Sequence, residues 1–126
     1  MKVFVVDDAS FIRILCRHYV TKAGYEMVGD AYDGPVALEQ ICKTQPDCVI
    51  MDLALPGLNG TDIIRHVHEK FSHIQFIIVS ALDEDFCKNQ IEDLSYVKFI
   101  TKPFDAEQIS EALQLAEQNL EKAKHG

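Results

Sequence analysis

The stretch Val49-Ile50-Met51-Asp52-Leu53-Ala54-Leu55-Pro56-Gly57 joins an apolar run to a single carboxylate and then to a Pro-Gly turn. The apolar run extends back to Cys48 and is bounded by a proline on each side, which is typical of a strand buried on both faces in a parallel sheet. In open α/β sheets, ligands bind beyond the carboxyl ends of the strands. We therefore predict a strand over 47–52 and a functional role for Asp52 at its end.

Apolar runs and helical patterns alternate along the rest of the chain. We predict strands over 3–6, 26–31, 47–52, 76–79 and 97–100, with helices over 10–23, 35–45, 61–71 and 83–94 and a last helix whose apolar stripe runs from Ile109 to Leu120. Strands that alternate with helices imply a parallel sheet with right-handed crossovers and helices on both faces. The predicted fold class is α/β, in one domain over 1–126, because no linker, repeat or low-complexity tract interrupts the pattern.

Local signals mark several helix ends. Ser10 is the expected N-terminal cap of the first helix, and Gly24 suits the left-handed residue that follows that helix. Pro35 suits the first turn of the second helix. The segment over 83–94 is polar and only moderately amphipathic, and we expect residues 121–126 to form a frayed, solvated end.

The composition argues against binding to nucleic acid or membrane. The chain has 12 Lys and Arg against 20 Asp and Glu, for a net charge of -8, so the basic surface that attracts a phosphate backbone is missing. No apolar segment is long enough to cross a bilayer, and the run after Met1 is too short for a signal peptide. Reduced thiols in a cytoplasmic protein are favoured by the wide spacing of the cysteines, which are Cys16, Cys42, Cys48 and Cys87.

Polar side chains end four of the five predicted strands or follow them directly. Asp7 and Asp8 follow the first strand, Asp52 ends the third, Ser80 follows the fourth, and Lys102 lies just past the fifth. The carboxyl ends of parallel strands share one edge of the sheet, so these side chains converge. Three carboxylates in one place repel one another and require positive charge. Lys102 supplies one charge, and a divalent ion with oxygen ligands, most suitably Mg²⁺, supplies two.

These groups together make a coherent phosphoryl-transfer site. Charge builds up on the oxygens of a transferred phosphoryl group, so cations and hydrogen-bond donors must already be aimed at them. We expect Asp52 to act as the nucleophile, Lys102 and Mg²⁺ to offset the developing charge, and Ser80 to donate a hydrogen bond. Each residue alone has a simpler explanation, such as a solvated Asp7-Asp8 turn or a helix cap at Ser80. Their conjunction at successive strand ends favours the site.

The same segments resemble the signature blocks of response-regulator receiver domains over almost the whole chain. The matching blocks are Val5-Val6-Asp7-Asp8, Met51-Asp52-Leu53-Ala54-Leu55-Pro56-Gly57, Val79-Ser80-Ala81 and Thr101-Lys102-Pro103-Phe104, with further matches at Asp33-Gly34, Ala37-Leu38-Glu39 and Asn59-Gly60. The resemblance implies a flavodoxin-like, doubly wound sheet of five strands in the order 2-1-3-4-5 with five helices. Alternation alone predicts the parallel sheet but not this strand order.

By position, the resemblance implies that Asp52 accepts a phosphoryl group from a sensor histidine kinase or a phosphotransfer protein. Asp8, Asp52 and the backbone carbonyl of Ala54 would then contact Mg²⁺, with Asp7 assisting through water. The peptide bond between Lys102 and Pro103 is expected to be cis, which a proline allows at low cost.

The resemblance also implies a phosphate-sensing switch. Ser80 and Lys102 form its sensing pair, and Phe99, three residues before the lysine, swings inward when Ser80 moves toward the phosphoryl group. This movement would change the face built from the fourth helix, fifth strand and fifth helix, where a downstream protein binds. The alternative for Phe99 is a static core aromatic.

Two departures from the family pattern bear on function. Ala54 and Leu82 carry no group that could orient an attacking water, which predicts slow hydrolysis of the phosphoryl group. The segment Asp93-Leu94-Ser95-Tyr96 lacks the small residue and glycine usual before the fifth strand, so the fourth helix and the loop after it are the least well specified part.

An α/β domain with these acids at one sheet edge suggests three functions. The favoured one is a single-domain regulator of the chemotaxis or relay type, not an enzyme on external substrates, although the chain could equally be a receiver from a larger regulator. A small Mg²⁺-dependent aspartyl-phosphate phosphatase would need a second acid where Ala54 stands, and a cap domain. A flavodoxin-like flavin binder would need a glycine-rich or hydroxyl-rich phosphate loop after the first strand.

The histidines suggest no rival metal site. His66 and His68 are expected to point to different sides of one helix. The others are expected at the surface, and they are His18, His73 and His125.

Overall fold

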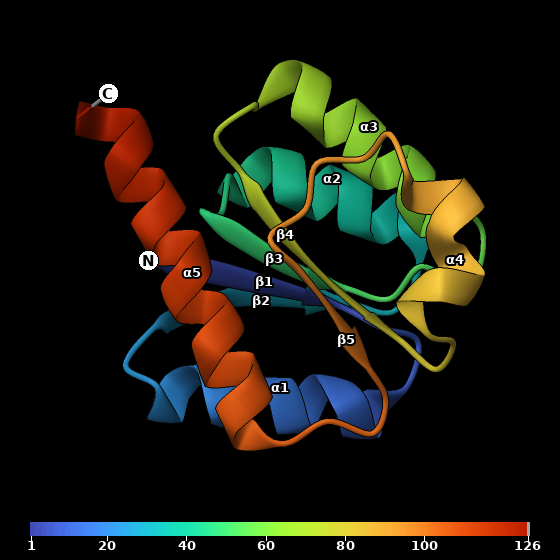
Figure 1. The fold of residues 1–126 in the computed structure, drawn as a ribbon, viewed down its shortest axis with the longest axis horizontal. Coiled ribbons are helices and arrows are strands. Elements are labelled where there is room, and N and C mark those ends of the chain that lie inside the picture. Colours follow the sequence, from blue (N-terminus) through green and yellow to red (C-terminus); the bar gives the residue numbers. More distant parts are fainter. Residues whose placement is uncertain (126) are drawn as a thin grey trace.

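Five parallel strands form the centre of the computed structural model, which describes residues 1–125 (Figure 1). They lie in the order β2-β1-β3-β4-β5 and alternate with five helices along the chain. The predicted fold class, strand order and number of elements are therefore confirmed. The elements are β1 (Lys2–Val6), α1 (Ser10–Lys22), β2 (Glu26–Ala31), α2 (Gly34–Thr44), β3 (Cys48–Met51), α3 (Gly60–Lys70), β4 (Gln75–Ser80), α4 (Glu84–Ile91), β5 (Lys98–Thr101) and α5 (Ala106–His125).

Side chains alternate between the two faces of the inner strands. Val3 and Val5 of β1 pack in one hydrophobic cluster with α1 and α5, whereas Phe4 and Val6 pack in a second cluster with α2, α3 and α4. The ribbon shows these two helix layers on opposite sides of the sheet (Figure 1). Apart from the first residue of β1 and of β4, every side chain of β1, β3 and β4 is buried. These strands therefore form a rigid base for the loops at their carboxyl ends.

Most helix ends agree with the sequence signals. Gly24 has φ of +92°, as expected for the residue that ends α1. Pro35 lies in the first turn of α2, and the carboxylate of Asp33 caps that helix by accepting a hydrogen bond from the Val36 N–H at 2.9 Å. Asp83 caps α4 in the same way through the Phe86 N–H at 2.7 Å.

The prediction that Ser10 caps α1 is wrong. Ala9 occupies the capping position, no side chain caps the helix, and Ser10 is its first residue. The cause lies one step earlier, because the Asp7 carboxylate accepts a hydrogen bond from the Ala9 N–H at 2.9 Å and thereby turns the chain before Ser10 is reached.

Two other helix ends also differ from prediction. α4 stops at Ile91 instead of continuing to Leu94, and the chain turns there, with the Leu94 N–H donating to the Ile91 carbonyl at 2.9 Å. α5 continues to His125, where a frayed end was expected, because the tail contains the strong helix formers Glu, Lys and Ala. The side chain of His125 and all of Gly126 lie outside the described residues.

The cysteines behave as predicted for reduced thiols. All four are free, with Cys16, Cys48 and Cys87 buried and Cys42 half-buried. Among residues 1–125, no helix combines the length and apolar character that a membrane span requires.

Gly60 begins α3 and lies against the strand end that carries Asp52. A Cβ atom added at Gly60 would lie 2.8 Å from the Asp52 carbonyl oxygen and 2.8 Å from the Leu53 Cα atom. The Gly60 N–H also donates to the Leu53 carbonyl at 3.0 Å. The absence of a side chain at this position therefore lets α3 hold the segment after Asp52 in place.

We predict that Gly60→Ala lowers the free energy of unfolding by roughly 1–3 kcal/mol, the usual cost of overpacking. Without the clash, alanine in a helix would stabilise by up to about 1 kcal/mol, so the sign of the change is diagnostic. Urea unfolding measures it. Gly24→Ala is the control, because nothing lies within 4 Å of a Cβ there and only the positive φ is penalised. A Gly60→Ala protein as stable as the wild type would contradict the packing argument.

Candidate functional site

The candidate site lies at the carboxyl edge of the sheet, where β1 and β3 end side by side. Val6 pairs with Met51 in the parallel register, so the residues that follow them, Asp7 and Asp52, are neighbours. The Asp52 N–H donates to the Val6 carbonyl at 3.0 Å. Both aspartates are buried, at 2% and 7% exposure. Adjacent strand ends therefore place two carboxylates together in a protected position.

Lys102 bridges these two carboxylates. Its Nζ atom lies 2.7 Å from Asp7 Oδ2 and 2.8 Å from Asp52 Oδ2, both within hydrogen-bond distance. The lysine follows β5, two strands away from β3 in the sheet, and the Lys102–Pro103 peptide is cis, as expected. Of the five residues predicted to converge, three are therefore in direct contact.

Short loops fix the second oxygen of each buried carboxylate. Asp7 Oδ1 accepts from the Ala9 N–H at 2.9 Å, and Asp52 Oδ1 accepts from the Ala54 N–H at 3.1 Å. Each aspartate thus turns the chain that follows its own strand and presents its other oxygen to Lys102. The two loops hold the carboxylates in defined orientations.

Asp8 completes an acidic cluster with Asp7 and Asp52. One carboxylate oxygen from each residue lies within 4.8 Å of the other two, and Asp8 is exposed whereas its partners are buried. Three carboxylates against one ammonium leave excess negative charge facing solvent on the Asp8 side. Oxygen ligands with this charge suit a hard cation such as Mg²⁺, so the residues present fit the predicted ion.

Burial and charge act in opposition on the titrating groups here. Burial raises the pKa of Asp7, and the hydrogen bond from Lys102 only partly offsets this effect. For Lys102, burial acts to lower the pKa, but the hydrogen bonds to Asp52 and Asp7 outweigh it and the pKa is raised. Lys102 is therefore charged at neutral pH.

Ser80 lies at the same edge, but its hydroxyl is hydrogen-bonded to the main chain and not to the carboxylates. Its Oγ atom accepts from the Leu82 N–H at 3.1 Å, and its backbone carbonyl accepts from the Lys102 N–H at 2.7 Å. The simpler explanation of Ser80 as a helix cap is wrong, because Asp83 caps α4.

Phe99 lies on β5, half-buried against the cluster that includes α4, and takes no part in the carboxylate contacts.

Sequence reasoning missed Arg13. Its Nη1 atom donates to the Asp7 carbonyl at 2.7 Å, and its Nε atom lies 3.8 Å from Asp30 Oδ2. Any residue carries a main-chain carbonyl, so no pattern in the sequence marks such a contact. The only available signal is an arginine in the first turns of the helix that follows the Asp7-Asp8 pair.

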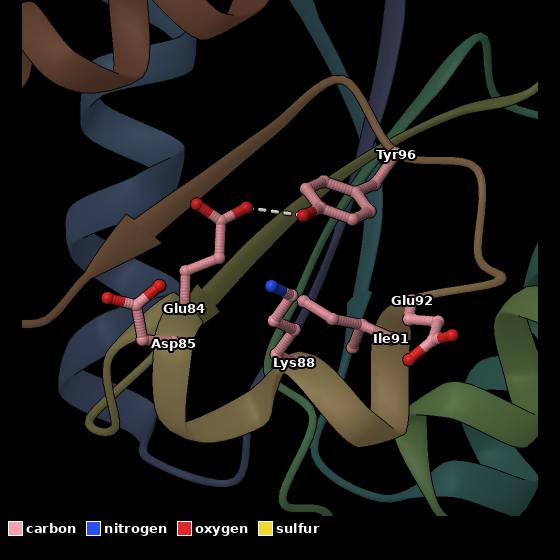
Figure 2. Close-up of a pocket in the computed structure, with 6 residues that line it drawn as sticks. All are labelled: Glu84, Asp85, Lys88, Ile91, Glu92 and Tyr96. Atoms are coloured by element: carbon pink, nitrogen blue, oxygen red, sulfur yellow. Dashed lines mark hydrogen bonds between the residues drawn. The ribbon is translucent and has the colours of Figure 1, made fainter.

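A separate cavity of about 470 Å³ lies between α4 and the segment before β5. Figure 2 shows Tyr96, from the segment before β5, pointing toward Glu84 on α4, to which the phenol donates a hydrogen bond, while Lys88 and Ile91 also extend from α4. The hydrogen bond to the Glu84 carboxylate, followed by burial, raises the pKa of Tyr96 to about 12. None of the lining residues belongs to the aspartate cluster; the lining is Glu84, Asp85, Lys88, Ile91, Glu92 and Tyr96.

Known proteins resemble this chain over most of its length. Residues 3–114 match the sequence profile described as "Response regulator receiver domain". The chain is 35% identical to the chemotaxis protein CheY of Thermotoga maritima over 89% of its own length and 93% of that protein. It is 32% identical to sporulation initiation phosphotransferase F of Bacillus subtilis, with 90% of each chain covered. The structure superposes on the REC domain of AraT, a response regulator from Geobacillus stearothermophilus, with a TM-score of 0.86 at 26% identity, covering 98% of this chain and 97% of the other.

We predict that Tyr96→Phe lowers the free energy of unfolding at pH 7 by about 1 kcal/mol, through loss of one hydrogen bond. The folded-state pKa is raised above the ordinary 10.0, so the contribution of the phenol is complete below pH 10 and falls as the pH rises toward 12. Urea unfolding of both proteins at pH 7 and pH 11 should show the difference shrinking at the higher pH. Glu84→Gln is the matched control at the other end of the bond. Equal stability of Tyr96→Phe and wild type at pH 7 would contradict the assignment.

Proposed function

Because the chain belongs to the response regulator receiver domain family, we propose that it is a single-domain response regulator that accepts a phosphoryl group on Asp52. The donor is a histidine kinase or a phosphotransfer protein of a two-component phosphorelay. The proposal rests chiefly on one observation, the contact of Lys102 with both Asp7 and Asp52 beside the third carboxylate of Asp8. Receiver domains are signalling proteins, and no observation here favours the phosphatase or the flavin binder.

The transfer step needs a nucleophile held next to a fixed positive charge. A carboxylate oxygen of Asp52 attacks the phosphorus of a phosphohistidine, the N–P bond breaks with its electron pair left on the imidazole, and an acyl phosphate forms on Asp52. Lys102 is charged and lies 2.8 Å from Asp52, so its ammonium can pair with the phosphoryl oxygens that replace the carboxylate charge. Ser80 would have to exchange its bond with the Leu82 N–H for one to the phosphoryl group.

Mg²⁺ belongs to the proposal as the second source of positive charge. Asp8, Asp52 and the Ala54 carbonyl would hold the ion, with Asp7 acting through water. When bound, the ion would neutralise charge on the phosphoryl oxygens. The excess negative charge of the three-carboxylate cluster supports this assignment.

The output step of the proposal uses the face formed by α4, β5 and α5. Phe99 lies on β5 and packs against the hydrophobic cluster that includes α4, so an inward swing would alter the same face that carries the cavity of Figure 2. A downstream protein would detect that change. Signalling through protein binding is supported by the similarity to a chemotaxis protein CheY, and a cytoplasmic location forms part of the same proposal.

The central prediction concerns the phosphoacceptor. Incubation with Mg²⁺ and acetyl phosphate should add one phosphoryl group to the wild type and none to Asp52→Asn, because the amide lacks the nucleophilic oxygen. Intact-mass spectrometry measures the added group. Asp62→Asn is the matched control, since it makes the same substitution at an exposed residue of α3 and should be labelled like the wild type. Equal labelling of Asp52→Asn would overturn the proposal.

A further prediction concerns the lifetime of the acyl phosphate. Ala54 and Leu82 are both exposed, so polar side chains can replace them without disturbing the core. Ala54→Asn combined with Leu82→Glu should orient water for attack at phosphorus and speed the loss of phosphate on the order of tenfold, a barrier change of about 1.4 kcal/mol.

The decay is followed by intact mass after removal of the donor. Leu82→Met, which keeps an apolar side chain of similar volume, should decay at the wild-type rate. A wild type that loses phosphate as fast as the double variant would show that these two positions do not limit hydrolysis.

A further inference from the structure

Arg13 connects the first turns of α1 to the loop that carries the acidic cluster. Its guanidinium donates to the Asp7 carbonyl at 2.7 Å, and its side chain is largely buried, with 19% exposure. The Nε atom lies 3.8 Å from the carboxylate of Asp30, near the end of β2. Arg17 lies 3.9 Å from the same carboxylate but is half exposed, and the hydrogen bond to the Asp7 carbonyl comes from Arg13 instead.

The bond from Arg13 acts on the peptide unit that joins the two acids. A peptide unit is planar, so fixing the Asp7 carbonyl oxygen also fixes the direction in which the chain continues to the Asp8 Cα atom. The other polar groups of Asp7 are held as well, the N–H by the Ala31 carbonyl at 3.1 Å and the carboxylate by Ala9 and Lys102. Among residues 1–125, no hydrogen bond holds the Asp8 side chain in this way. The position of Asp8 therefore depends on the Asp7–Asp8 peptide.

We propose that Arg13 is a positioning residue for the cation site: by holding the Asp7 carbonyl, it sets Asp8 at the distance from Asp7 and Asp52 that a bound Mg²⁺ needs. The inference rests on the proposed function, which assigns Mg²⁺ to this cluster. It goes beyond that function by giving a role to a residue that touches neither the ion nor the phosphoryl group.

Charge and positioning predict opposite effects of removing Arg13. A cation near a metal site repels the metal, so loss of the Arg13 charge alone would tighten Mg²⁺ binding. Loss of the hydrogen bond frees the Asp7–Asp8 peptide and weakens binding. Substitution of residues that orient metal ligands typically costs 10–100-fold in affinity, and the repulsion from the Arg13 charge is reduced because that charge is paired with Asp30.

We predict that Arg13→Met raises the Mg²⁺ dissociation constant of the unphosphorylated protein roughly tenfold, as measured by titration calorimetry. Arg17→Met is the matched control, since it removes the same charge from the same Asp30 partner, and it should bind Mg²⁺ as tightly as the wild type or more tightly. Arg13→Lys, which keeps the charge and one donor, should fall between the wild type and Arg13→Met and serves as the test should Arg13→Met fail to fold.

A purely structural role is separated by measuring stability without Mg²⁺. Tyr25→Phe removes a hydrogen bond to Glu117, far from the acidic cluster, and should lower stability without changing the Mg²⁺ dissociation constant. A wild type that does not bind Mg²⁺ would overturn the proposed metal site itself. A wild type that binds Mg²⁺ while the Arg13 variants bind equally well or better would overturn the positioning role alone.

Discussion

The ammonium of Lys102 holds together two buried carboxylates that would otherwise repel each other. It contacts Asp7 at 2.7 Å and Asp52 at 2.8 Å, and so joins the ends of β1 and β3 to the segment after β5. Burying two carboxylates without a positive partner would destabilise the fold by several kcal/mol. The site therefore depends on a balance of charge between three separate segments, and the sheet matters because it brings those segments to one edge.

One ammonium does not neutralise the acidic cluster, and the stability of the hydrophobic core compensates for the remaining negative charge. Asp8 adds a third carboxylate to the cluster, and burial keeps the pKa of Asp7 raised despite Lys102. Each fully buried Val, Ile or Phe side chain contributes roughly 1.5–3 kcal/mol, and the inner strands are lined by such residues on both faces. The fold can thus hold its acids in an arrangement that is unfavourable alone and that favours an added cation.

The parts of the structure that could be predicted are those that a local sequence pattern determines. Continuous apolar runs marked the buried strands, and the ends of those strands then placed Asp7, Asp52 and Lys102 together. The strand order could not be derived from alternation, since right-handed crossovers permit several orders, and it required the family resemblance. The start of α1 was misplaced because a turn made by Asp7, and not the hydroxyl of Ser10, begins the helix. Arg13 escaped notice because its partner is a main-chain atom.

The connection between the acidic site and the α4-β5-α5 face runs through main-chain pairing. The Lys102 N–H donates to the Ser80 carbonyl at 2.7 Å, and Ser80 pairs with Thr101 in the parallel register of β4 and β5. Two positions earlier in the same ladder, Phe99 pairs with Ile78. In the proposed switch, a movement of the Ser80 hydroxyl toward Asp52 would break its bond with the Leu82 N–H, next to the end of the β4–β5 ladder. Phe99 is half-buried in that ladder, whereas its partner Ile78 is fully buried, so of the two side chains Phe99 is the one that the proposed switch can use.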